Sequence, residues 1–160
     1  EKSIMIDFFN LMMGTDILIS WNGEFFGIPV LNCRSLKNKV CNTYLTNNIE
    51  HIDLKYTLSN ENNNGISSLD RFSKGLDLPG KRLASGKEIW DLYLNEKINE
   101  ISDYCTEDLL NTYLIYLNYE IITGAITEED FKKKYISLTD YLQSISNDAL
   151  NTFGSKMKSI

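Results

Sequence analysis

Tyr104 and Asp108 are the residues of this chain whose types and spacing most clearly suggest chemistry. They lie four residues apart in a segment with a strongly helical pattern, so both side chains should project from one face of a helix. A tyrosine hydroxyl can orient a water molecule, and an aspartate beside it can hold a divalent cation. The pair therefore predicts half of a site that hydrolyses phosphodiesters, although a Tyr-x-x-x-Asp pair taken alone is more often structural.

A second segment that could contribute to such a site covers residues 21–31. A short apolar strand ends there in Asn22-Gly23, and a helix begins with Phe25 and Phe26. Ligand sites of α/β folds lie where the C-terminal ends of strands meet helix N-termini, and helix N-termini favour phosphate. The alternative is that Asn-Gly forms an ordinary turn and that both phenylalanines belong to the core.

The composition of the chain fits one packed domain. Its 160 residues are enough to bury a core, and a hydrophobic fraction of 42% argues against disorder. No apolar run approaches the roughly 20 residues of a membrane helix, and the start of the chain lacks the pattern of a signal peptide. The three cysteines show no Cys-x-x-Cys spacing, which argues against a zinc site and fits a reducing cytoplasm. We therefore expect a cytoplasmic protein that does not bind a membrane.

The charge of the chain is unevenly distributed. The net charge is −6, which disfavours a protein that binds nucleic acid through phosphate contacts alone. Residues 34–87, however, contain nine Lys or Arg against five acids. A basic middle is compatible with a nucleic acid held beside a carboxylate site, and the alternative is ordinary solvated charge.

The periodicity of apolar residues predicts strands and helices in the first part of the chain and only helices from residue 67 onward. Along the longest helix, an apolar stripe at helical spacing is expected to belong to the core. In the first part we expect a helix at 4–13, strands at 16–21 and about 49–58, a helix at 25–36 with Pro29 in its first turn, and a polar loop at 60–65. In the second part we expect helices at about 67–75, 86–95, 97–123 and 127–146, with a core stripe of Ile101, Cys105, Leu109, Leu110, Leu114, Leu117 and Ile121.

Several of these segments, in this order, resemble the predicted 3'-5' exonuclease family related to the proofreading domain of B-family DNA polymerases. That family belongs to the DEDD exonucleases of the ribonuclease-H-like fold. The likeness spans roughly residues 4–142. It rests on Ser20-Trp21-Asn22-Gly23 with Phe26 and Pro29-Val30-Leu31, His51-Ile52-Asp53-Leu54, Ser68-Leu69, Leu78-Pro79-Gly80-Lys81, and the segments Asp103 to Asp108 and Leu110 to Tyr113.

The fold that the resemblance implies is of the α/β class. It is a ribonuclease-H-like exonuclease fold, helix-rich and without the first strands of the family's sheet. Residues 1–146 would form the partial exonuclease-like domain, and residues 147–160 would be a C-terminal tail. The expected substrate is single-stranded DNA or a frayed 3' end, with RNA as another option.

The chemistry that the resemblance implies is metal-dependent hydrolysis. Four carboxylates in the family hold two Mg²⁺ or Mn²⁺ ions at the scissile phosphate, and one ion lowers the pKa of the attacking water. Asp108 matches the carboxylate of the third motif and is thus expected as a metal ligand. Tyr104 matches the tyrosine that orients the water, as in the DEDDy type.

Contacts with the nucleic acid are implied for four further residues. Asn22 and Phe26 match residues of the second motif that lie near the terminal nucleotide. His51 and Asp53 belong to a segment typical of the family, where a nucleic-acid contact is one interpretation. A structural role at the end of a strand is the other interpretation for Asp53.

Two departures from the family's pattern affect the predicted metal site. Gly27 occupies the position where the second-motif aspartate is expected, and glycine offers no ligand. The first motif, an Asp-x-Glu strand, would precede Glu1. Glu24 would share a helical face with Gly27 and is a weak candidate for a substitute ligand. Because one carboxylate cannot hold two hard cations, the alternative function is a catalytically inactive nucleic-acid-binding or interaction module.

Overall fold

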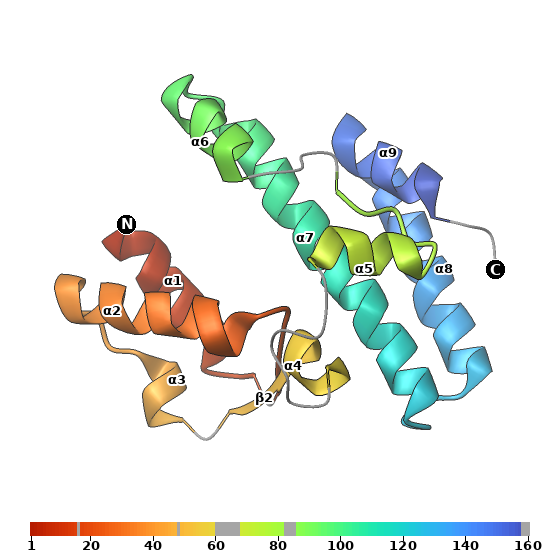
Figure 1. The fold of residues 1–160 in the computed structure, drawn as a ribbon, viewed down its shortest axis with the longest axis horizontal. Helices are drawn as coiled ribbons and strands as arrows, with labels where there is room; N and C mark the ends of the chain where they lie inside the picture. The colour runs from red at the N-terminus through yellow and green to blue at the C-terminus, as the bar shows by residue number, and fades with distance from the viewer. Residues whose placement is uncertain (16, 48, 60–67, 82–85, 158–160) are drawn as a thin grey trace. The chain divides into compact units, whose positions relative to one another are not determined.

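The chain consists of two compact units, residues 1–66 and 67–160, which we describe separately. The computed structural model describes residues 1–15, 17–47, 49–59, 68–81 and 86–157 (Figure 1). The polar loop predicted at 60–65 and the first residue of the strand predicted at 16–21 lie outside these ranges. Among the described residues, no helix combines the length and the apolar character that a membrane span requires.

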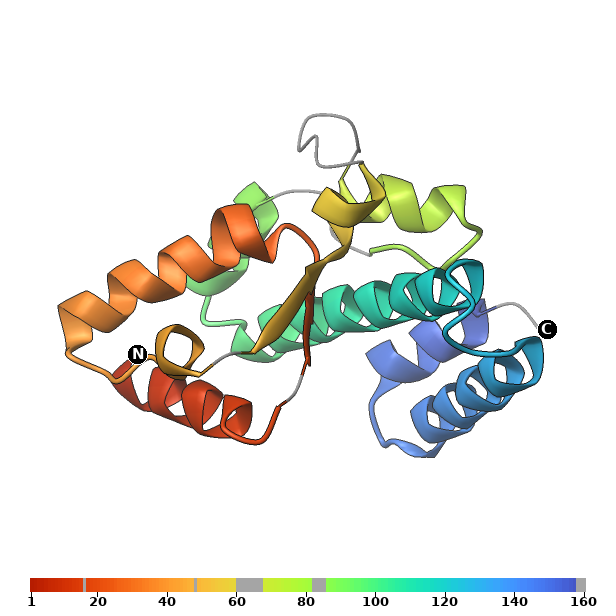
Figure 2. The same ribbon diagram turned by 90° about the horizontal axis from the view of Figure 1, so that it is seen from below.

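The first unit is built around two parallel strands. Strand β1, Ile17–Ser20, pairs with β2, Glu50–Asp53, so that Ser20 lies opposite Asp53 and both strands end at the same edge (Figure 2). Parallel neighbours need a crossover connection, and helices supply it here. The crossover consists of the π-helical turn η1, Gly23–Gly27, and of helices α2, Ile28–Asn38, and α3, Thr43–Thr46.

Helix α1, Lys2–Met12, supplies the core of the first unit. Met5, Phe9 and Met12 are spaced by four and three residues, which places them on one face, and all three are buried. Partly buried apolar side chains from the strands and the crossover helices pack against them, including Leu18, Leu31 and Tyr44.

Two predictions for the first unit need correction, and one helix was not predicted. The predicted strand at 49–58 ends at Asp53, because the Asp53 carboxylate accepts hydrogen bonds from the backbone N–H groups of Lys55 and Tyr56 and caps helix α4, Leu54–Leu58. The predicted helix at 25–36 begins instead with the π-helical turn, and Pro29 falls in the first turn of α2, as expected. Helix α3 was not predicted.

The second unit is a set of helices around the long helix α7, Ile98–Ile122. Helices α8, Glu128–Ser144, and α9, Asp148–Lys156, pack against it and against each other (Figure 1). A capping box begins α8, where Thr127 and Asp130 exchange hydrogen bonds. Helices α5, Leu69–Gly75, and α6, Gly86–Leu94, also contact α7. The buried core residues are Leu114, Leu117, Tyr135, Leu142, Leu150, Phe153 and Met157.

The second unit also departs from two expectations. Residues 148–156, expected within a C-terminal tail, form α9, which Asn147 caps and which adds Phe153 to the core. In the predicted core stripe, Leu114 is buried, whereas the Leu109 side chain is 69% exposed. The middle of α7 instead buries the polar side chains of Glu107 and Asn111, so the apolar stripe does not continue along the whole helix.

The architecture is therefore helix-rich α/β with a small parallel sheet, which agrees with the coarse fold class expected from the sequence.

Candidate functional site

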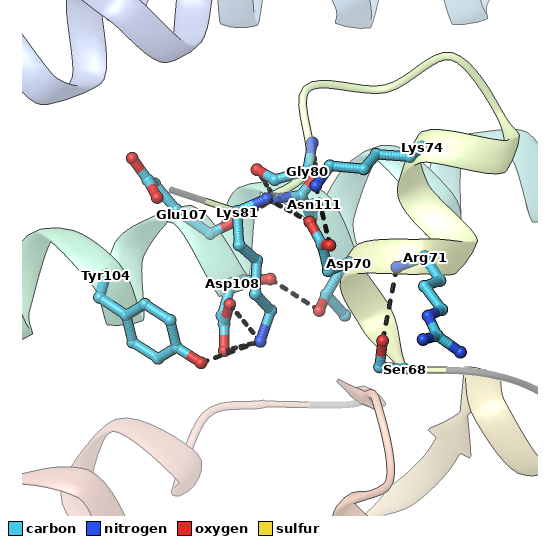
Figure 3. Close-up of polar contacts among 11 residues, drawn as sticks. Ser68, Asp70, Arg71, Lys74, Gly80, Lys81, Tyr104, Glu107, Asp108 and Asn111 are labelled. Carbon is cyan, nitrogen blue, oxygen red and sulfur yellow. Dashed lines mark hydrogen bonds and ion pairs between the residues drawn. The ribbon is translucent and has the colours of Figure 1, made fainter. Parts of the chain in front are cut away.

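Tyr104 and Asp108 lie together on one face of α7, where a third residue joins them. The Lys81 ammonium donates to the Tyr104 hydroxyl at 3.1 Å and lies 2.8 and 2.9 Å from the two carboxylate oxygens of Asp108 (Figure 3). The same ammonium lies 5.0 Å from the centre of the Tyr104 ring. A phenol, a carboxylate and an ammonium thus converge on one point of the second unit.

The turn that carries Lys81 is held by hydrogen bonds on both sides. Its backbone N–H donates to the Asp70 carboxylate at 2.8 Å, and the Lys74 ammonium donates to the same carboxylate at 2.9 Å. The Asn111 side chain accepts from the Gly80 N–H at 3.0 Å and donates to the Gly80 carbonyl at 2.9 Å. The backbone at residues 80 and 81 is therefore fixed to both α5 and α7.

The turn requires glycine at position 80 because of its backbone conformation and its close approach to Asp70. Its φ of +69° lies in the left-handed region, where a side chain is strained. A Cβ at this position would lie 2.8 Å from the carboxylate oxygen of Asp70 that receives the Lys81 N–H. The glycine thus lets the turn approach α5 closely enough to aim Lys81 at α7.

Burial and pairing set the protonation of this cluster. Burial raises the pKa of Asp108 above its ordinary 3.8, and the neighbouring Lys81 ammonium offsets only part of that rise. Burial acts to lower the pKa of Lys81, but the hydrogen bonds to Asp108 and Tyr104 outweigh it and raise that pKa above 10.5. The lysine is therefore a held cation beside the Asp108 carboxyl group.

Asp53 has a structural role in the first unit. Its side chain is 3% exposed, and its oxygens accept the backbone N–H groups of Asn22 and Glu24 at 2.8 and 2.9 Å and that of Lys55 at 3.1 Å. One carboxylate thus joins the end of β2 to the start of η1 and caps α4. Of the two interpretations left open for Asp53, these contacts favour the structural one.

His51 is held between two hydroxyl groups. Its Nε2 lies 2.8 Å from Ser20 Oγ, and its Nδ1 lies 3.2 Å from the Tyr44 hydroxyl. Burial lowers the pKa of the ring below 6.5, although Asp53 and Glu24 act against that shift. Both ring nitrogens are thus engaged within the first unit, and the ring links the two strands to α3.

The second-motif candidates lie in the π-helical turn η1 or directly before it. Asn22 adopts a left-handed conformation with φ of 63°, and its side-chain oxygen accepts from the Lys55 ammonium at 3.2 Å. The Phe26 side chain is 66% exposed. Hydrogen bonds in a π-helix span five residues, so Glu24 and Gly27, three residues apart, do not share a face as they would in an α-helix. This geometry disfavours Glu24 as a substitute ligand.

The residues that each unit brings together do not fit a two-cation centre. Among the described residues, no group of three or more His, Cys, Asp or Glu side chains lies close enough to hold a metal ion. Both oxygens of Asp108 face the Lys81 ammonium, which occupies the place where a cation would approach. Hard cations need several convergent oxygens, and the second unit offers Asp108 beside a lysine instead.

Lys81 and Asn111 were not predicted from the sequence as residues of the site. Lys81 belongs to a segment that carries the family resemblance, but nothing in its immediate neighbours indicates a partner 27 residues further along the chain. The available signal was a lysine directly after a Pro-Gly turn. Asn111 follows Asp108 by three residues on α7, a spacing that places it near the same face.

A comparison with known protein families gives a match. Residues 1–157 match a family described as a predicted 3'-5' exonuclease related to the exonuclease domain of PolB. The comparisons with curated proteins and with solved structures give no match. The match covers nearly the whole chain, including Tyr104, Asp108 and Lys81. It confirms the family resemblance predicted from the sequence. The chain therefore belongs to the family of predicted 3'-5' exonucleases related to the exonuclease domain of PolB.

Proposed function

We propose that this chain acts at the 3' ends of nucleic acids as a 3'-5' exonuclease-type domain, and that Tyr104, Asp108 and Lys81 carry its hydrolytic site. The observation that supports the proposal is that Lys81 contacts both Tyr104 and Asp108 of α7, at distances of 3.1 Å or less, in a chain of this family. The proposal includes a ribonuclease-H-like fold and a single-stranded DNA or frayed 3' end as substrate.

Each of the three side chains has a role that its chemistry suits. Hydrolysis joins a water oxygen to phosphorus and breaks the bond to the 3' oxygen of the preceding nucleotide, which takes up a proton. The Tyr104 hydroxyl is suited to orient the water, and the Asp108 carboxylate, whose pKa burial raises, is suited to accept a proton from it. The Lys81 ammonium is suited to stabilise negative charge on a phosphate oxygen. The divalent cations implied by the family remain a prediction.

The direct test follows the shortening of a single-stranded oligonucleotide that carries a fluorophore at its 5' end, with Mn²⁺ present. We expect a ladder of products shortened from the 3' end. Asp108→Asn should slow it by at least about a hundredfold, and Tyr104→Phe should slow it less. Asp140→Asn, which changes an exposed aspartate on α8 in the same way, is the matched control. Trimming that survives in Asp108→Asn would exclude Asp108 from the site.

A second candidate function is a nucleic-acid-binding module without hydrolysis. The ion pair between Lys81 and both oxygens of Asp108 favours it, and so does the glycine at position 27. Such a module would bind single strands with an affinity that falls with salt and does not change with EDTA, and the exposed Phe26 could stack on a base. Loss of binding on chelation would count against it.

Gly27 allows the two functions to be separated by a gain of activity. A Cβ at Gly27 would meet no atom within 4 Å, so Gly27→Asp can introduce the missing second-motif carboxylate without a clash. Gly14 has the same open surroundings, and Gly14→Asp is the matched control. An exonuclease-type site predicts faster trimming in Gly27→Asp alone. A pure binding module predicts no trimming in either variant.

A further inference from the structure

The Lys81 ammonium surrounds itself with the oxygen atoms that a metal ion at Asp108 would need. Three oxygens lie within 3.1 Å of its nitrogen: both carboxylate oxygens of Asp108, at 2.8 and 2.9 Å, and the Tyr104 hydroxyl (Figure 3). An ammonium group has three N–H donors and one positive charge. The number of close oxygens therefore equals the number of donors, and the lysine neutralises the carboxylate as a bound cation would.

The Asp108 carboxylate depends on this ammonium. Its Oδ1 atom is buried, and among the residues that the structure describes no hydrogen bond reaches that atom. The ion pair with Lys81, at 2.8 Å, therefore compensates the charge on Oδ1. A buried charge without a partner is costly, so the carboxylate favours the closed pair. The Lys81 side chain is itself only 15% exposed, so a cation from solvent has to displace it before binding both oxygens.

The backbone around Lys81 keeps the ammonium in this position. The Lys81 N–H donates to the Asp70 carboxylate at 2.8 Å. The Asn111 side chain exchanges hydrogen bonds with the N–H and the carbonyl of Gly80. Because the turn is fixed on both sides, the ammonium can leave Asp108 only by rotation of its own side chain. Asp70 pairs in turn with Lys74 at 2.9 Å, so both aspartates that contact Lys81 are compensated by lysines.

We propose that Lys81 is a built-in cation that excludes divalent metal ions from Asp108. The ammonium and a metal ion compete for one carboxylate, and the charge of Lys81 keeps that carboxylate closed. The inference rests on the proposed function, since it concerns the regulation of the site assigned to hydrolysis. Mg²⁺ and Mn²⁺ bind proteins through one or two carboxylates and several water molecules. A carboxylate freed from its ammonium is therefore enough for weak binding, whereas the ammonium repels a second cation at contact distance.

The test measures Mn²⁺ binding to the full chain without nucleic acid, so its result does not depend on hydrolysis. The ¹⁵N-labelled chain is titrated with Mn²⁺, and paramagnetic broadening of the amide signals of residues 104–112 on α7 is followed. Lys81→Met removes the charge and adds no ligand. We expect it to bind Mn²⁺ at these residues at least about tenfold more tightly than the unchanged chain. Lys81→Gln, a polar second variant, should show the same gain, and Lys81→Arg, which keeps the charge, should show none.

Two controls locate the effect. Lys134→Met breaks another ion pair with α7, the 2.9 Å pair to Glu120, and should leave broadening at residues 104–112 unchanged. Asp108→Asn combined with Lys81→Met should abolish the gain. A dispersed amide spectrum verifies the fold of each variant.

Three results would overturn the proposal. These are Mn²⁺ binding at residues 104–112 that is as tight in the unchanged chain as in Lys81→Met, a gain that survives Asp108→Asn, and the absence of a gain in both Lys81→Met and Lys81→Gln. Failure of the proposed function would appear in the trimming assay instead, and it would leave the Mn²⁺ result in place.

Discussion

The ion pair between Lys81 and Asp108 should contribute measurably to the stability of the second unit. The two side chains are 15% and 32% exposed, so the pair lies between an exposed pair and a fully buried one. Exposed pairs contribute under about 1 kcal/mol, whereas breaking a buried pair costs about 3–5 kcal/mol. For Lys81→Met we therefore expect a loss of about 2 kcal/mol in the free energy of unfolding at neutral pH.

A double-mutant cycle isolates this contribution. Lys81→Met, Asp108→Asn and the double variant should give a coupling energy of about 2 kcal/mol in urea unfolding. The chain has two tryptophans, Trp21 in the first unit and Trp90 in the second, so a Trp21→Phe background lets the remaining fluorescence report on the second unit. A coupling energy below about 0.5 kcal/mol would refute the inference that the pair is formed in solution.

The same pair predicts a dependence on pH. Burial raises the folded-state pKa of Asp108, so ionisation of this group destabilises the folded state. The Lys81 ammonium restores part of that stability. The loss caused by Lys81→Met should therefore be largest at neutral pH. It should shrink as the pH falls through the pKa of Asp108, where the protonated carboxyl no longer needs a cation. A loss that stays constant down to pH 3 would contradict this assignment.

Three further predictions concern residues that stabilise each unit by contacts within that unit. Asp53→Ala should destabilise the first unit by about 3 kcal/mol, measured by Trp21 fluorescence in urea, because it leaves several backbone N–H groups without their acceptor. Gly80→Ala should cost about 2 kcal/mol in the second unit because it forces a side chain into a left-handed conformation, and an unchanged thermal midpoint would argue against that turn. The pKa of His51 is lowered in the folded state, so its contribution to stability is present above pH 6.5 and is lost as the pH falls through the folded pKa. His51→Gln should flatten that part of the pH–stability curve.

Local patterns predicted much of the second unit. The helical period of the sequence placed Tyr104 and Asp108 on one face of a helix, and α7 has that face. The capping box at Thr127 was also predictable, because it needs only two side chains three residues apart. These features depend on neighbours in the sequence, which periodicity and capping rules describe well.

Tertiary contacts decided what the sequence pattern could not predict. The pairing of Lys81 with Asp108 depends on how a turn packs against α7. The apolar periodicity predicted a strand at about 49–58, but the Asp53 carboxylate ends that strand by capping α4. The segment after Asn147 forms a helix whose apolar face packs against α7 and α8, a contact that the local sequence does not indicate.

The decisive experiment compares the release of mononucleotides from a labelled 3' end by the unchanged chain and by Asp108→Asn, with Mn²⁺ present and under single-turnover conditions. We expect release by the unchanged chain and a loss of at least about a hundredfold in the variant, because Asp108 is the carboxylate at the centre of the proposed site. Equal rates in the two proteins would exclude the proposed function of Asp108, and release from the 5' end would exclude a 3'-5' exonuclease.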